Sequence, residues 1–582
     1  MSFIGVDVGT GSVRSCLITS NGESYTATKN ISRVSNSKYS NFITQSTDEI
    51  FLSVILTIKQ VIELSPKNEQ VKGISVTATC SMAVFEVDQS SKENRLIPYA
   101  CDYDGLDSSQ NIILWMDSRA LKECNEINGI VSKSILSSVG GSYIPEMGLP
   151  KLKWLSQNNP QEKFIVAFEL HDWITAKLLS GDLCLQSISI SKNISNNIRN
   201  GTIDGSILGC DLETLQALKI TENNIFIGSA NKQPINEFLG TNLGFISKDL
   251  YETFPLGVTS ETIIVSGCID CYAGWISTIM DPVQFSNPIY MVAGTSTCFL
   301  LPAISETIDK TNLVKGVWGP FSQFLPDISL YQSGQPATGK LYETLFNEYE
   351  ELLLKEDGSP FEVLERETLK LERDHNQSIT YLLRNYLYYG DHFGNRCPYN
   401  DPLMGSMMID GFNSTSGLPS VWERSLVGLT IKYNLIQEFI CLQTQEIITN
   451  MSKSNCLIDT IIISGSQSKN ERFLKLLGKV TNKKIFIGDK DGESDTVVAK
   501  GAALLAKLGS IGGVLTVSTV SKYKQKFVNK SIDEEVPEYY QQYPSNSIQN
   551  SSDSSILKLK GEFLKEMAHL QNRFRSKINS CI

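Results

Sequence analysis

The chain has 582 residues, of which 41% are hydrophobic and 20% charged, and its formal net charge is −11. This length exceeds what one compact core holds, so two large domains are expected, and the composition excludes disorder of the whole chain. The negative charge argues against a nucleic-acid partner, because such proteins gain affinity from Lys and Arg that neutralise phosphates.

The N-terminus carries Asp7 where a secretory signal would need an uninterrupted apolar stretch. No later segment offers about 18 or more apolar residues in a row. The thirteen cysteines are scattered, and the Cys-x-x-Cys pair at Cys268 and Cys271 lacks the second pair that a tetrahedral zinc site needs. We therefore expect a cytoplasmic protein with free thiols and no membrane partner.

The first eighteen residues alternate β-branched positions around a Gly/Thr/Ser turn, which predicts a β-hairpin. Apolar positions at helical spacing then predict a helix over about 48–64, with Thr47 or Asp48 as its cap. An apolar strand over Val71–Thr77 follows and leads into Cys80 and Ser81.

A second strand–turn–strand pattern, containing Gly294 and Thr295, returns at residues 289–300. Two halves that open with similar hairpins suggest a duplicated α/β domain. Residues 459–465 then predict a buried strand that meets a Gly/Ser turn, followed by a helix over about 470–480.

The character of the chain changes after about residue 506. Residues 529–555 are rich in Ser, Asn, Gln and Pro, which is typical of a linker or a disordered stretch. Helical spacing returns over about 556–578. We expect this helix to pack on its own domain rather than on a partner, as amphipathic helices ordinarily do.

Phosphoryl transfer needs amides and hydroxyls around phosphates, Mg²⁺ near carboxylates and a base beside the acceptor hydroxyl. Asp7 and the turn that follows it offer the carboxylate and the small residues, although such a turn alone is equally well structural. The turn at Gly294 strengthens this interpretation because it supplies a matching clamp. The turn at Gly465 stands where a strand enters a helix, so it could hold phosphate or adenosine or be a structural turn.

Asp270 lies in a Gly/Ala-bounded turn just before the second half begins. A carboxylate there could accept the acceptor's hydroxyl proton during phosphoryl transfer. The alternative is an aspartate that merely caps a helix. A redox role for the flanking Cys-x-x-Cys is disfavoured because no thioredoxin-like pattern surrounds it.

Seven motifs together resemble the FGGY carbohydrate kinases, in the family's order from residue 1 to about 508. They are Asp7-x-Gly-Thr, Trp115-Met-Asp-Ser-Arg119, Gly267-x-x-Asp270, Ala293-Gly-Thr-Ser, Ser333-Gly-Gln-Pro-Ala-Thr-Gly339, Gly465-Ser-Gln-x-x-Asn470 and Ala499-x-Gly-Ala-Ala503. The resemblance implies an α/β fold with two actin-like (ribonuclease H-like) ATPase domains around an interdomain cleft, plus a C-terminal helical tail. The implied boundaries are a sugar-binding domain at 1–281, a nucleotide-binding domain at 288–510 and a linker with helical tail at 511–582.

The resemblance also implies roles for individual residues. Asp270 would be the catalytic base and Asp7 the carboxylate on the Mg²⁺ side. ATP would be bound by Thr10, Gly11, Ser12, Arg14, Gly294, Thr295, Gln335, Gly465, Ser466, Gln467 and Asn470.

Within the family, the run from Thr79 to Met82 resembles a motif of the D-ribulokinase branch, and residues 145–152 and 390–396 point the same way. The resemblance implies D-ribulose as acceptor and ribulose 5-phosphate as product. The expected sugar-binding residues are Cys80, Ser81, Trp115, Asp117, Arg119 and Glu146. For Trp115 a buried indole, and for Arg119 a salt bridge to a neighbour, are the structural alternatives.

Two rival functions stay open. One is a kinase for xylulose, ribitol, glycerol or another small polyol. The other is a non-catalytic ATP-binding sensor or scaffold that uses the tail helix to hold a partner, against which Asp7 and Asp270 argue. A homodimer is compatible with either function.

Overall fold

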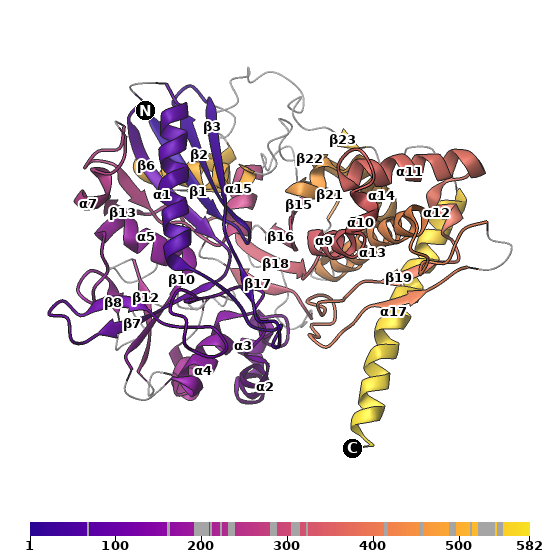
Figure 1. Ribbon diagram of the computed structural model, residues 1–582, viewed down its shortest axis with the longest axis horizontal. Coiled ribbons are helices and arrows are strands. Elements are labelled where there is room, and N and C mark those ends of the chain that lie inside the picture. Colours follow the sequence, from indigo (N-terminus) through magenta and orange to yellow (C-terminus); the bar gives the residue numbers. More distant parts are fainter. Residues whose placement is uncertain are drawn as a thin grey trace.

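The computed structural model describes most of the chain. The described residues are 1–66, 69–159, 163–190, 206, 209, 212–220, 224–230, 239–255, 257–279, 288–303, 315–321, 324–412, 417–452, 458–487, 496–512, 515–521, 542–543 and 551–581. The predicted domain boundary between residues 281 and 288, and most of the predicted linker at 529–555, lie outside them. Figure 1 shows two α/β halves beside each other, with the C-terminal helix on the second.

The first half contains two sheets. One has six strands in the order β13 (Asn242–Phe245), β14 (Ile263–Val265), β6 (Val71–Ala78), β1 (Ser2–Val8), β2 (Ser12–Thr19) and β3 (Ser24–Asn30). The other has β11 (Ser189–Ile190), β12 (Ile225–Ser229), β10 (Ile165–Glu169), β7 (Met82–Asp88), β9 (Ile112–Ile113), β5 (Ile43–Gln45) and β4 (Val34–Ser35), with β8 (Arg95–Pro98) paired to β7.

The second half is built on one large sheet. Its order is β17 (Trp318–Phe321), β18 (Ser329–Gln335), β16 (Thr297–Ala303), β15 (Pro288–Ala293), β21 (Thr460–Ser464), β22 (Lys484–Ile487) and β23 (Gln542–Tyr543). A small sheet pairs β19 (Leu387–Tyr389) with β20 (Met407–Ile409).

The predicted duplication is confirmed by the topology of the two large sheets. In the first, the antiparallel pair β1–β2 continues antiparallel to β3, and β1 continues on its other side parallel to β6 and β14. In the second, the antiparallel pair β15–β16 continues to β18, and β15 continues parallel to β21 and β22. Each half therefore presents its hairpin turn at the same edge of an equivalent sheet.

Helices cover the sheets and connect their strands. In the first half they are α1 (Thr47–Leu64), α2 (Leu121–Ile130), α3 (Lys133–Ser138), α4 (Gly148–Asn158), α5 (Leu170–Ser180), α6 (Leu212–Ala217), α7 (Lys248–Tyr251) and α8 (Asp270–Thr278). In the second they are α9 (Gly339–Glu348), α10 (Glu350–Leu353), α11 (Pro360–His375), α12 (Ile379–Leu382), α13 (Leu426–Ser452), the 3-10 helix η3 (Ser466–Lys469), α14 (Glu471–Thr481), α15 (Val497–Ser510) and α17 (Ser551–Asn579).

Helix α15 joins the two halves, because it comes late in the chain but packs on the first sheet and on α8. A Cβ atom at Gly5 of β1 would lie 2.0 Å from the carbonyl oxygen of Ala499, and one at Gly501 would lie 1.9 Å from that of Ala273. Such separations leave no room for a side chain. Glycines on both sides of the contact thus allow α15 to approach the sheet and α8 closely.

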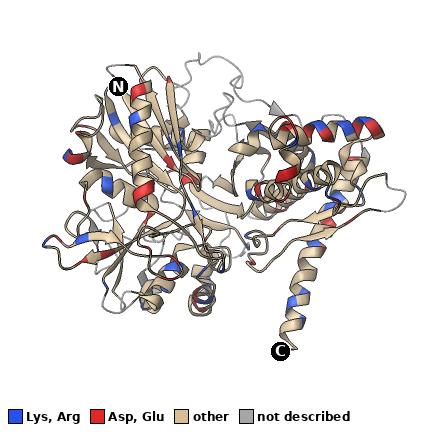
Figure 2. Cartoon of the chain, in the orientation of Figure 1, with Lys and Arg blue, Asp and Glu red and all other residues tan. Residues whose placement is uncertain are grey.

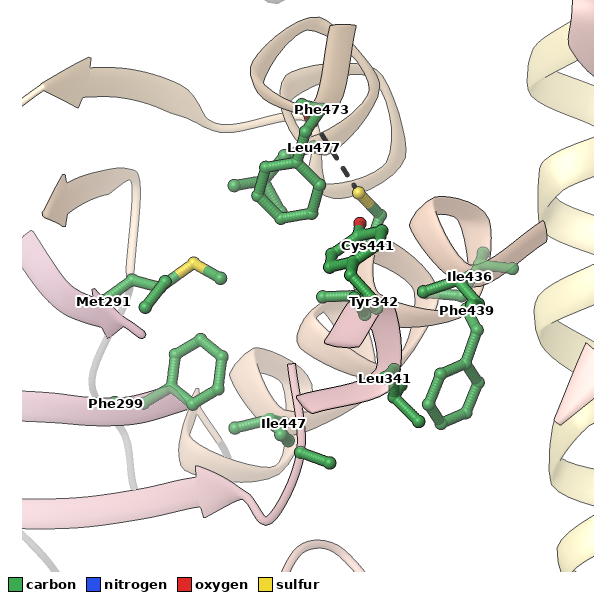
Figure 3. Packing of buried hydrophobic residues seen from close by; sticks show 14 of the residues in the cluster. Met291, Phe299, Leu341, Tyr342, Ile436, Phe439, Cys441, Ile447, Phe473 and Leu477 are labelled. Carbon is green, nitrogen blue, oxygen red and sulfur yellow. Dashed lines mark hydrogen bonds between the residues drawn. The ribbon is translucent and has the colours of Figure 1, made fainter. Parts of the chain in front are cut away.

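The core of the second half lies between its sheet and the helices α9, α13 and α14. Figure 3 shows Met291 and Phe299 of the sheet facing a helical layer. The labelled helical residues of this cluster are Leu341, Tyr342, Ile436, Phe439, Cys441, Ile447, Phe473 and Leu477. Burying such side chains contributes about 1.5–3 kcal/mol each, so this layer holds the second hairpin rigidly at its sheet edge.

Local predictions were correct in kind and differ in detail. The cap of α1 is Ser46 rather than Thr47 or Asp48, because the Ser46 side chain accepts a hydrogen bond from the amide of Glu49. Strand β21 does not turn directly into a helix, since η3 intervenes before Asn470 caps α14. Asp270 is the first residue of α8 rather than a turn residue, and Ile269 occupies the cap position.

The tail helix α17 begins at Ser551, five residues before its predicted start, and packs on the second half as expected. Its buried residues Leu557, Leu564 and Met567 belong to that core. In the described part of the chain, no helix combines the length and apolarity that crossing a bilayer requires. The free-thiol prediction is confirmed for the cysteines that the structure describes, Cys268 and Cys271 included.

Candidate active site

The first hairpin carries a buried charge at its tip. Asp7 pairs in register with Arg14 across β1 and β2, and Arg14 Nη1 lies 3.4 Å from Asp7 Oδ2. The other oxygen, Oδ1, is buried without a hydrogen-bond partner. Burial raises the pKa of Asp7 to about 6, although the guanidinium of Arg14 opposes the shift. A buried, half-satisfied carboxylate is a group that a cation or a hydrogen-bond donor would complete.

A chain of hydrogen bonds positions Trp115 beside this hairpin. The indole Nε1 of Trp115 donates to Thr10 Oγ1 at 2.9 Å, and its backbone amide donates to Ser81 Oγ at 3.0 Å. Ser81 is in turn hydrogen-bonded to Thr79 at 2.8 Å. The hydroxyls of the Thr-Cys-Ser motif therefore orient the tryptophan, while Cys80 between them lines the cavity described below.

Asp270 starts α8 and faces the same space. Its Oδ1 accepts a hydrogen bond of 2.7 Å from the amide of Cys271. The pKa of Asp270 is raised well above its ordinary value, first by burial and then by the negative charges of Asp7 and Cys298. The two aspartates thus lie close enough to repel each other when both are ionised.

The second hairpin presents backbone groups rather than charges. The amide of Gly294 donates to Ser296 O at 2.9 Å, and the start of α9 is tied to the turn, since Gly339 N donates to Gly294 O at 3.0 Å. A Cβ atom at Gly339 would lie 2.7 Å from that carbonyl oxygen. The first amides of α9 are therefore used to fix the helix against the turn, and the positive end of its dipole lies beside it.

The two hairpins open onto one cavity of about 500 Å³. Twelve of the predicted site residues line it together with Asp7. They are Thr10, Gly11, Ser12, Arg14, Cys80, Trp115, Glu146, Asp270, Gly294, Thr295, Gly465 and Ser466. Glu146 adds a second buried oxygen, Oε2, that has no partner. The structure thus gathers residues from seven separate segments of the chain around acceptors that lack donors.

The prediction missed three residues that the second half contributes to the cavity wall. Arg396, Trp318 and Gln332 line the cavity opposite the first hairpin. The guanidinium of Arg396 lies 5.4 Å from the centroid of the Trp115 ring, and its Nε is buried without a partner. The signal available in the sequence is the Gly394-Asn395-Arg396 run, from which only the branch of the family is predicted.

A larger cavity of about 1430 Å³ adjoins the first, because Ser466 lines both. Its walls include Tyr342 and Tyr433 and the predicted nucleotide residues Gln467 and Asn470. Gln467 keeps a buried, unpartnered Oε1. Asn470 uses its side-chain oxygen to cap α14, accepting from Phe473 N at 3.1 Å. Gly465 adopts φ +86°, and a Cβ atom there would lie 2.4 Å from Ala293 O, so only glycine suits the corner where the cavities meet.

Four predicted site residues lie off the cavity walls. Asp117 and Arg119 form a fully buried ion pair at 2.8 Å, with the guanidinium over the rings of Phe42 and Trp154. Arg119 therefore forms the salt bridge that was the structural alternative to a sugar-binding role. Ser81 is occupied with Trp115, and Gln335 donates to Ile440 O at 3.2 Å. These four residues would contribute to ligand binding only by positioning other residues.

The fold is shared with solved sugar kinases. The ligand-bound xylulose kinase of Lactobacillus acidophilus superposes with a TM-score of 0.67, at 17% sequence identity and over 99% of each chain. The two halves therefore share the two-domain actin-like fold of these structures, as predicted.

Sequence comparisons narrow the class to a family. Residues 2–238 match the N-terminal domain and residues 289–509 the C-terminal domain of the FGGY family of carbohydrate kinases. The protein MPA43 of Saccharomyces cerevisiae is 33% identical over 478 residues, covering 80% of this chain and 79% of that protein. The D-ribulokinase YDR109C of the same yeast is 33% identical over 543 residues, covering 87% of this chain and 72% of that protein. The chain belongs to the FGGY family of carbohydrate kinases.

Proposed function

We propose that this carbohydrate kinase transfers the γ-phosphoryl group of ATP to the terminal hydroxyl of D-ribulose. The observation that carries the proposal is that Asp270 lines the same cavity as the unpartnered carboxylate oxygens of Asp7 and Glu146, together with an uncharged hairpin. The sugar itself is suggested by the name of the yeast D-ribulokinase and by the Thr-Cys-Ser run at residues 79–81.

Asp270 would act as the general base. A carboxylate whose pKa is raised binds a proton more readily than an ordinary aspartate, and it therefore draws the proton from the attacking hydroxyl more effectively. The proton would pass to Asp270 while the hydroxyl oxygen attacks the γ-phosphorus, the bond from that phosphorus to the β-phosphate oxygen breaks, and ADP leaves. The sugar would lie between Trp115, Glu146 and Arg396, and Glu146 would accept hydrogen bonds from the sugar hydroxyls.

The phosphates would lie between the hairpins. The uncharged turn at Gly294 and the hydroxyl of Thr295 line this side of the cavity, and the dipole of α9 would favour the negative phosphates. The adenosine would occupy the larger cavity, where Tyr342 and Tyr433 offer aromatic surface and Gln467 an unpartnered oxygen.

The residues fit a magnesium ion that accompanies ATP. Asp7 Oδ1 is a buried acceptor without a donor, and Asp270 adds negative charge beside it. Among the described residues no three or more His, Cys, Asp or Glu side chains gather as ligands, so Asp7 would hold the ion mainly through water and phosphate oxygens. The ion would supply neutralisation of the developing phosphate charge.

An acceptor panel tests the proposal. Purified chain is given ATP and Mg²⁺ with D-ribulose, D-xylulose, ribitol or glycerol, and ADP release is measured by a coupled assay, with Asp270→Asn as the blank. We expect kcat/KM for D-ribulose to exceed that of each other acceptor by about tenfold or more. A higher value for D-xylulose would replace the assigned sugar, and nucleotide binding without ADP release on any acceptor would favour the sensor or scaffold.

A cytoplasmic location stays a prediction.

A further inference from the structure

The C-terminal helix α17 has one face that is fully used by its own domain. Asp553 pairs with Lys479 at 2.8 Å, and Lys560 pairs with Glu438 at 2.5 Å in a buried position. Further along, Gln571 Nε2 donates to Gly405 O at 3.0 Å. This face accounts for the attachment of the helix to its own domain.

A second face carries an exposed apolar stripe. Its members are Leu559, Phe563, Leu570, Phe574 and Ile578, and each is between 45% and 65% exposed. They follow one another at intervals of four, seven, four and four residues, which places them along one side of the helix. The helix end projects from the body (Figure 1), and every side chain from 576 to 581 is exposed. Large apolar side chains in such a row are typical of a helix–helix interface.

A charged row flanks the stripe and changes sign along the helix. Glu562 and Glu566 stand in the first part, Arg573 and Lys577 in the second, and all four are exposed. None of them forms an ion pair with another described residue. Beyond Glu566 the chain contains no acidic residue, and the projecting end in Figure 2 carries basic residues only. Each like-charged pair is spaced four residues apart, which destabilises an isolated helix.

We propose that α17 binds a second copy of this chain as an antiparallel helix pair. If Phe563 lies opposite the partner copy's equivalent of Phe574, the acidic part of each row meets the basic part of the other. Glu562 then falls between the positions of Arg573 and Lys577. A parallel pair would instead place Glu against Glu and Lys against Lys, so the charges select the antiparallel orientation.

The antiparallel arrangement also fits the shape of the molecule. It lays the projecting end of each helix beside the body-bound first part of the other, where Leu559 and Phe563 are exposed. The two bodies then stand at opposite ends of the helix pair. The proposal does not depend on the identity of the sugar or on the kinase reaction.

Sedimentation velocity of the full chain tests the proposal. The wild type is expected to form a concentration-dependent dimer. The variants E562K/E566K and R573E/K577E each make the row one sign, so each alone is expected to be monomeric. An equimolar mixture of the two is expected to dimerise, because all-basic and all-acidic rows complement each other. E350K/E351K, on exposed residues of α10, is the matched control and should dimerise like the wild type.

Three results would overturn the proposal. They are a wild type that stays monomeric up to its solubility limit, a dimer that survives both charge reversals, and a mixture that does not reassociate. Kinase activity of the two variants, measured in parallel, is expected to equal that of the wild type, since neither alters a residue that lines the two cavities of the candidate active site. Loss of activity in a variant that remains folded would mean that the row serves the site instead of a second copy.

Discussion

The two hairpins occupy equivalent places in equivalent sheets, yet they differ in chemistry. The cross-strand pair Asp7 and Arg14 of the first hairpin corresponds in register to Val292 and Cys298 of the second. All four line the same cavity. The duplicated hairpins therefore differ in charge. The first is charged, which suits acid–base and cation chemistry, and the second is an uncharged hairpin of amides and hydroxyls, which suits phosphate oxygens.

This difference predicts that changes at Asp7 and Asp270 alter kcat and its pH dependence, and that a change at Glu146 alters the KM for the sugar. Changes in the second hairpin should instead alter the KM for ATP. The following variants test that division, beginning with the largest expected effect.

Asp270→Asn should lower kcat by about 10² to 10⁴, because the amide cannot take the hydroxyl proton. ATP binding, measured by calorimetry, should change little. Asp249→Asn is the control, since Asp249 is an exposed first-turn aspartate of α7. A kcat within a few-fold of the wild type would exclude Asp270 as the base.

Asp7→Asn should lower kcat by about 10² while stabilising the ligand-free protein at high pH. The folded-state pKa of Asp7 is raised to about 6, so its contribution to the free energy of unfolding is fully present below about pH 4 and is lost as the pH rises through 6. A shift of this size corresponds to roughly 3 kcal/mol.

Urea unfolding of the wild type and of Asp7→Asn between pH 4 and pH 8 gives the measurement. The wild type should lose stability over this range, and the variant should lose less, with Asp270 accounting for part of the remaining slope. Parallel curves for the two proteins would contradict the assignment of the shifted pKa to Asp7.

Glu146→Gln should raise the KM for the sugar by about tenfold, because a charged acceptor facing the cavity is replaced by a neutral one. The KM for ATP should stay constant. Steady-state kinetics with each substrate varied separately would distinguish this result from a general loss of activity. An unchanged sugar KM would place the acceptor elsewhere in the cavity.

Thr295→Val should have the smallest effect, raising the KM for ATP about three- to tenfold through loss of one hydroxyl. Thr10→Val is its counterpart in the first hairpin. That variant should also raise the KM for the sugar, because Thr10 Oγ1 accepts the indole hydrogen bond of Trp115. Equal effects of the two variants on both constants would remove the proposed division between the hairpins.

The sequence allowed the repeated hairpins, the strands that follow them and the tail helix to be predicted, because each has a strong local period. Side-chain direction was harder to predict. Asp117 and Arg119 have the polar character of a sugar site, but the rings of Phe42 and Trp154 enclose the pair away from the cavity. The contribution of Arg396 was missed because only tertiary packing brings it over Trp115.

The packing of α15 on β1 affects how the chain folds during its synthesis. Strand β1 is the first strand to leave the ribosome, but the helix that packs on it, α15, ends at Ser510. Gly5 can therefore contact Ala499 only after this helix has been synthesised. Contacts so distant along a chain slow folding and prolong the exposure of apolar surface. We expect the nascent first half to depend on chaperones until synthesis is nearly complete, and stalled chains released before and after residue 510 would differ sharply in protease resistance.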